Sequence, residues 1–97
     1  MPDVQLLIKV DDRWSLMPVE IKLGWIAHGR LWIEQLRPAQ VGWHVRFMRA
    51  GGEARLVVGV KEEGDWTPWV PPWDEQSVIT WKLGWEIRFC KKWHIWA

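Results

Sequence analysis

The nonapeptide V-G-W-H-V-R-F-M-R at residues 41–49 has a counterpart at residues 83–91, L-G-W-E-I-R-F-C-K. All nine positions align without a gap: apolar, Gly, Trp, polar, β-branched, Arg, Phe, soft apolar and base. A partial copy, L-G-W, stands at residues 23–25. In both full copies apolar residues alternate with polar residues or glycine, which places the two sets on opposite faces of a strand. We therefore predict two β-strands in which the glycine serves the packing of the sheet.

The segments around these copies carry further strand and turn signals. Apolar patterns predict strands at residues 4–10, 19–27, 31–36, 54–60 and 78–91, the last of which contains the copy at 83–91. A shorter extended piece at residues 14–17 ends at Pro18, because proline cannot donate to a sheet ladder. Gly51-Gly52 is a favoured hairpin pair, so we expect the strand at 41–49 to form a hairpin with the one after it. Only residues 33–40 admit a short helix, and Pro38 interrupts it.

These signals add up to about seven strands and predict an all-β fold, a small antiparallel sandwich or barrel. The 97 residues suffice for a single domain spanning 1–97. Residues 61–77 break the pattern, because they contain three prolines, five acidic residues and three tryptophans. Proline lacks the donor that a central strand needs, so we expect residues 61–77 to form one long Trp- and Pro-rich loop with polyproline character.

Charge and cysteine content narrow the classes of function. The chain carries 13 basic and 12 acidic side chains, and a net charge of +1 gives no bulk electrostatic case for duplex DNA or an anionic membrane. Its one cysteine, Cys90, excludes an internal disulfide. No apolar run approaches the length of a membrane-spanning helix, and the N-terminal residues lack the pattern of a signal peptide. We therefore expect a cytoplasmic protein or one assembled into a particle.

The sequence shows no catalytic or metal-binding pattern. The candidate metal ligands are scattered, without the paired spacing of a zinc site: His28, His44, His94 and Cys90. No serine stands in a nucleophile-elbow motif, and the glycine pair lacks the lysine and hydroxyl of a phosphate-binding loop. A role for Cys90 as a nucleophile, with a histidine supplied by the fold, has no further support. We expect no enzyme activity, no metal and no cofactor.

Tryptophan is the outlier of the composition, with 11 residues in 97. A domain of this size cannot bury that many indoles completely, so some must lie at the surface. We assign to the core the aromatic residues of the Gly-Trp segments, Trp25, Trp43, Phe47, Trp85 and Phe89. The indoles of the long loop and of the C-terminal segment are the candidates for contact with a partner or ligand: Trp66, Trp69, Trp73, Trp93 and Trp96.

Several roles stay open for these contact candidates. The loop indoles could cover an open end of the barrel as a lid, contact a protein partner, or stack on a sugar ring. Near the C-terminus, three bases interleave with aromatic residues: Arg88, Lys91 and Lys92. That pattern is typical of proteins that bind single-stranded nucleic acid, whereas lysines on an edge strand also discourage edge-to-edge pairing.

Because tryptophan is enriched at interface hot spots, a surplus beyond the capacity of the core favours protein contacts. Our hypothesis from the sequence is a non-catalytic β-domain that acts through protein–protein contacts. It would be a homo-oligomer or an accessory or structural subunit of a larger assembly, such as a viral or phage particle. The alternative is a ligand-binding module that takes glycans or single-stranded nucleic acid through exposed tryptophans.

Overall fold

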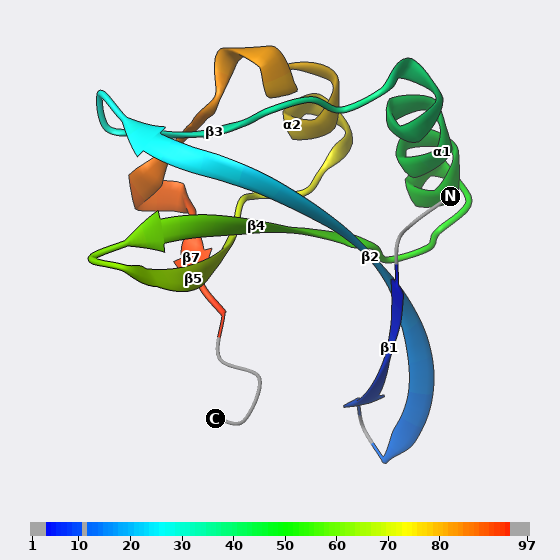
Figure 1. The fold of residues 1–97 in the computed structure, drawn as a ribbon. Helices are drawn as coiled ribbons and strands as arrows, with labels where there is room; N and C mark the ends of the chain where they lie inside the picture. The colour runs from blue at the N-terminus through cyan, green and yellow to red at the C-terminus, as the bar shows by residue number, and fades with distance from the viewer. Residues whose placement is uncertain (1–3, 11, 94–97) are drawn as a thin grey trace.

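The structure is a computed structural model that describes residues 4–10 and 12–93 (Figure 1). Three strands precede the first helix: β1 (Val4–Val10), β2 (Arg13–Ala27) and β3 (Arg30–Ile33). The middle of the chain forms α1 (Pro38–Arg49), β4 (Arg55–Glu62), β5 (Asp65–Val70) and α2 (Glu75–Ile79). Two 3-10 turns and two very short strands follow: η1 (Trp81–Leu83), β6 (Trp85–Glu86), η2 (Ile87–Phe89) and β7 (Lys91–Lys92).

The strands form one curled, mixed sheet, and the expected antiparallel sandwich or barrel is wrong. The strand order is β6-β3-β2-β4-β5-β7, and β1 is added to β2. The central pair, β2 and β4, is parallel, because the chain passes from β3 through α1 before it returns as β4. The other pairs described are antiparallel. Strands do predominate, as predicted, but α1 and α2 were not expected.

The hydrophobic core lies between the sheet and the two helices. Its buried side chains come mainly from β3 and β4, with Val78 of α2 and Trp85 of β6. Val41, Val45 and Met48 of α1 pack against this cluster. The helices therefore cover one face of the sheet (Figure 1), and no helix of the described residues covers the opposite face of its central strands.

Residues 41–49, predicted to be a strand, lie in α1. Pro38 begins this helix, since the first helical position needs no N–H donor and favours the fixed φ of proline. Gln40 Oε1 accepts a hydrogen bond from the Arg37 backbone N–H (2.9 Å) and caps the first turn. The apolar residues at 41, 45 and 48 follow the helical period and face the core. The expected hairpin at residues 50–53 is therefore wrong, and this segment connects α1 to β4.

Residues 78–91 do not form the predicted last strand either. The segment runs through the end of α2, then η1, β6, η2 and the start of β7. Gly84 has a φ of +70°, a conformation that turns the chain and favours glycine. Only the partial copy at residues 23–25 lies in a regular strand, β2. There Gly24 has the predicted packing role, because a Cβ would lie 2.0 Å from the carbonyl oxygen of Trp32 in β3.

Residues 61–77 form a hairpin and a short helix, so the predicted single long loop is wrong. A turn at residues 63–64 joins β4 to β5, and α2 begins at Glu75. Pro68 lies within β5 because its missing N–H faces away from β4. Its carbonyl points to the outer side, where it accepts from the Trp93 backbone N–H (2.9 Å). Likewise Pro18 does not end a strand, since β2 continues through it and Pro18 pairs with Gln5.

The aromatic residues assigned to the core differ in how far the structure buries them. Trp85 is buried, and its indole N–H donates to the Ser77 carbonyl (3.2 Å). Trp43 and Phe47 are half-buried and stack on each other along α1, with 4.8 Å between ring centroids. Trp25 and Phe89 are 47% and 57% exposed, so they lie outside the core. In β2 the side chain of Trp25 lies on the sheet face that is turned away from the helices. Phe89 lies in η2 and not in a strand.

Candidate functional site

The β1–β2 hairpin extends beyond the rest of the sheet as an arm (Figure 1). Val19 pairs with both Val4 and Arg55, which places β1 and β4 on opposite edges of β2. The pairing with β4 begins at that level, so residues 13–18 of β2 have no described strand on the β4 side. The outer edge of β1 has none among the described residues either. The arm is thus a two-stranded ribbon with two open edges.

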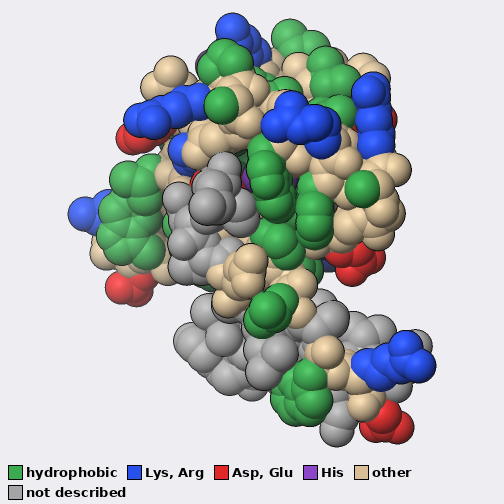
Figure 2. Space-filling view, turned by 90° about the vertical axis from the view of Figure 1, so that its right-hand side faces the viewer, with side chains coloured by type: hydrophobic (Ala, Val, Ile, Leu, Met, Phe, Trp, Pro, Cys, Tyr) green, Lys and Arg blue, Asp and Glu red, His purple; other side chains and the backbone are tan. Residues whose placement is uncertain are grey.

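The arm is also poorly covered by the rest of the molecule. β1 packs against β2 and against no other element to a comparable extent. Leu16, in the middle of the arm, is 62% exposed. Figure 2 shows the few described side chains of the arm tip, with basic, acidic and hydrophobic ones among them, away from the body of the protein. An exposed two-stranded ribbon of this kind is a candidate surface for contact with another chain.

A second apolar surface lies on the sheet face that the helices leave uncovered. Leu23 and Trp25 of β2 and Trp66 of β5 are exposed there. They come together across Gly59 of β4, whose Cβ, if present, would touch the Leu23 and Trp66 side chains at 3.5 and 3.6 Å. The sequence singled out Trp66 for contact but assigned Trp25 to the core. The strand pairing decides that both indoles border the same shallow hollow.

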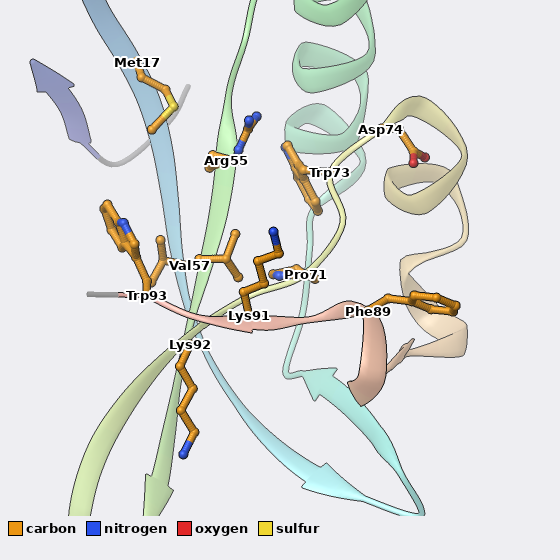
Figure 3. A pocket seen from close by; sticks show the side chains of 11 residues that line it. Met17, Arg55, Val57, Pro71, Trp73, Asp74, Phe89, Lys91, Lys92 and Trp93 are labelled. Atoms are coloured by element: carbon orange, nitrogen blue, oxygen red, sulfur yellow. The ribbon is translucent and has the colours of Figure 1, made fainter. Parts of the chain in front are cut away.

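A pocket of about 460 Å³ opens near the base of the arm (Figure 3). Arg55 of β4 and Lys91 of β7 reach into the space between two half-buried indoles, Trp73 and Trp93. Apolar side chains from the sheet, including Val57, add to the lining. The pocket therefore combines cationic groups with aromatic walls.

Among the described lining residues cations outnumber acids, with Arg55, Lys91 and Lys92 against Asp74. Nη1 of Arg55 donates to the adjacent carbonyl of Ala54 (2.8 Å). Lys92 points to the opposite side (Figure 3), where its Nζ lies 3.9 Å from the Glu62 carboxylate. Among the lining residues Asp74 is the only acid, and its carboxylate caps α2 by accepting from the Ser77 backbone N–H (2.8 Å).

A buried polar network lies behind the Trp73 wall. The Trp73 indole N–H donates to Nδ1 of His44 in α1 (3.2 Å), and Nε2 of His44 lies 3.5 Å from Oε1 of Glu20 in β2. The side chains of His44 and Glu20 are fully buried. Burial lowers the pKa of His44 to about 4, so the ring is neutral near pH 7, as acceptance at Nδ1 requires. The network therefore holds the Trp73 ring in place from the core side.

The structure describes four of the five predicted contact tryptophans and does not gather them on one surface. Trp66 is exposed on the uncovered sheet face, while Trp69 packs against the core beneath Lys92, whose Nζ lies 5.3 Å from its ring centroid. Trp73 and Trp93 face each other across the pocket (Figure 3). Trp96 lies outside the described residues. The indoles of residues 61–77 therefore do not form one surface.

The predicted basic segment divides in the same way. Lys91 and Lys92 form β7 at the end of the strand order, and both are exposed. Arg88 lies in η2, where its guanidinium donates to the carboxylate of Glu86 (3.1 Å). The third cation of the pocket region, Arg55, was missed, because a single arginine in a strand pattern carries no signal for a site.

Cys90 and His44 are chemical candidates that the structure describes, whereas His94 lies outside the described residues. Cys90 is buried, its Sγ lies 3.5 Å from the Glu86 carbonyl, and burial raises the pKa of the thiol to about 11. Within residues 4–10 and 12–93, no three His, Cys, Asp or Glu side chains gather as metal ligands would. In the same residues no helix is both long enough and apolar enough to cross a membrane. His44, which the strand interpretation placed on a polar face, is enclosed in the core by the helical period.

Comparison with known proteins adds no relative: no protein-family model, curated protein or solved structure matches this chain.

Proposed function

We propose that this chain is a non-catalytic, β-rich domain that acts through protein–protein contacts, as a homo-oligomer or as an accessory or structural subunit of a larger assembly. The observation that carries the proposal is the β1–β2 arm, with its two open strand edges and the exposed side chain of Leu16. An isolated two-stranded hairpin is marginally stable in water, and open edges are templates for pairing with another chain. A partner strand would complete the hydrogen bonding of the arm.

The partner that fits the arm best is a second copy of the chain. The outer edge of β1 is a seven-residue strand, and two such edges can pair antiparallel about a two-fold axis. The net charge of +1 leaves little long-range repulsion between copies. In such a dimer, apolar side chains of the other copy would cover the exposed side chain of Leu16, and this burial would stabilise the contact.

The experiment is light scattering on a sizing column over a wide range of protein concentration, with the variant Leu16→Lys. Leu16 lies on β2, one strand in from the pairing edge, so a lysine there removes apolar surface that the other copy would cover and adds a charge that the contact would desolvate. The wild type should form a discrete dimer or higher oligomer, and the variant should be a monomer with an unchanged melting temperature. Amide hydrogen exchange of the β1 segment should be slow in the oligomer and fast in the variant.

Leu83→Lys is the matched control, because Leu83 is similarly exposed, at 65%, but lies in η1 and not in the arm. This control should keep the oligomeric state of the wild type. A wild type that stays monomeric at every concentration would refute self-association, and an oligomer that both lysine variants leave intact would refute the role of the arm.

A further inference from the structure

The pocket between Trp73 and Trp93 has the features of a ligand site that the proposed protein contacts do not use. Its volume of about 460 Å³ lies within the range of small-molecule sites, roughly 300–1,000 Å³. Arg55 and Lys91 come from different strands yet reach into the same space (Figure 3). Neither has an ion pair with a described carboxylate closer than 4 Å. Apart from the bond of Arg55 Nη1 to the Ala54 carbonyl, the donors of these two cationic groups remain available to a ligand.

The shape of these groups narrows the chemistry of the ligand. A guanidinium offers a planar fork of donors that matches phosphate or carboxylate oxygens, and an ammonium adds a point charge. The two indoles beside them offer flat apolar faces on which a planar ring can stack. An anion without a ring would leave the indoles unused, and a neutral ring would leave both cations unused.

The Trp73 wall is fixed from behind, which distinguishes the pocket from a chance hollow at the surface. Its indole N–H is held by His44, which in turn faces Glu20 inside the core. Burying the polar side chains of His44 and Glu20 costs stability. In return, packing and hydrogen bonding fix the Trp73 ring, as a preorganised binding site requires. Arg55 is likewise placed by a central strand, β4, and its Nη1 is anchored on the Ala54 carbonyl.

We propose that the pocket binds a nucleoside monophosphate unit, with the base stacked against Trp73 or Trp93 and the phosphate between Arg55 and Lys91. This ligand supplies in one molecule the anion and the planar ring that the lining calls for. The unit can come from a free nucleotide or from single-stranded nucleic acid, and the two share this chemistry. Because the two cations share one phosphate, a single strand should show a salt slope of roughly −0.7.

The test is isothermal titration of the full chain with AMP, adenosine, inorganic phosphate and an oligo-dA of eight nucleotides. AMP should bind saturably, and adenosine and phosphate should each bind at least about tenfold more weakly, because each loses one half of the contacts. If the source is free nucleotide, the oligonucleotide should bind no more tightly than AMP. If the source is a single strand, it should bind more tightly and with the salt slope given above.

Lys91→Gln is the first variant, because Lys91 is exposed and its substitution leaves the core intact. It should weaken AMP about tenfold and leave the melting temperature unchanged. Lys82→Gln is the matched control, since Lys82 is an exposed lysine of η1 that does not line the pocket. Trp93→Leu should weaken AMP about tenfold but leave the weak binding of inorganic phosphate as it was.

Three results would overturn the proposal: no saturable binding of AMP, adenosine bound as tightly as AMP, or equal losses in Lys91→Gln and Lys82→Gln. None of them bears on the arm, because oligomerisation is measured separately on Leu16→Lys. Signals of the Trp73 and Trp93 indole N–H groups in a nitrogen–proton correlation spectrum would localise the ligand. Shifts confined to other indoles would also count against this pocket.

Discussion

Gly24 and Gly42, two of the three glycines that precede a tryptophan, should change the stability of the protein in opposite directions when each is replaced by alanine. Gly24 lies in β2, where an added Cβ would lie 2.0 Å from the Trp32 carbonyl oxygen and 2.6 Å from Cγ1 of Val58. Neither atom can move without shifting a strand or the core. Gly42 lies inside α1, where the nearest atom is the end of the exposed Arg46 side chain, 3.0 Å away.

The magnitudes follow from these distances. Overpacking a core costs about 1–3 kcal/mol, and a clash with strand backbone puts Gly24→Ala at the upper end, about 3 kcal/mol or more. Replacing glycine by alanine within a helix gains about 0.5–1 kcal/mol, so Gly42→Ala should stabilise the protein. A small domain has only about 5–15 kcal/mol in total, and 1 kcal/mol moves the melting temperature by roughly 4–8 °C.

Guanidinium denaturation of the wild type and both alanine variants, followed by circular dichroism, measures the two effects. The midpoint should fall strongly for Gly24→Ala and rise for Gly42→Ala, with the slope unchanged in each. A loss in Gly42→Ala as large as that in Gly24→Ala would contradict the helix at residues 38–49. A loss below about 1 kcal/mol in Gly24→Ala would refute the close approach of β2 and β3.

Three further predictions concern buried and exposed polar groups. Burial lowers the pKa of His44 to about 4, so the unfolded chain takes up this proton first as the pH falls below about 6.5. The free energy of unfolding should therefore drop by roughly 3 kcal/mol more between pH 7 and 4 in the wild type than in His44→Gln, as measured by denaturation at each pH. An equal drop in both proteins would show that His44 is not a buried neutral ring. The Cys90 thiol, whose pKa burial raises to about 11, should react with a disulfide reagent at pH 8 at least about 100-fold more slowly in the folded than in the unfolded protein; equal rates would place it at the surface. Arg49→Gln, which removes the exposed ion pair with Glu75 between α1 and α2, should leave the denaturation midpoint nearly unchanged, and a large shift would contradict a solvent-screened pair.

The sequence patterns that predicted the fold correctly are those that fit only one type of secondary structure. Residues 4–10 form a strand as expected, and the strands predicted at 19–27 and 31–36 correspond to the end of β2 and to β3, which a turn at residues 28–29 joins. In β4 the apolar set at 56, 58 and 60 points to the core, as strand alternation requires. The tryptophan surplus also has the expected consequence, since Trp25 and Trp66 are exposed.

The strand prediction for residues 41–49 was wrong because the apolar residues of this segment fit both the strand period and the helix period. Positions 41, 43, 45 and 47 alternate as in a strand, while 41, 45 and 48 lie on one face of a helix. Pro38 and Gln40 were the available signal, because proline at the first position and a glutamine in the first turn favour a helix start. Because Pro38 was interpreted as interrupting a helix, the helix that it begins was not predicted.

The sequence by itself determined the strand-rich composition of the fold, most of its strand positions and the excess of indoles over core capacity. The tertiary structure decided which face each residue serves, because that choice depends on partners far along the chain. The parallel pairing of β2 with β4 brings Glu20 beneath His44. The position of β7 at the end of the sheet places Lys91 near Arg55. Burial energy is set by these long-range contacts and not by local pattern, so the arm, the pocket and the buried network appear only when the chain is folded.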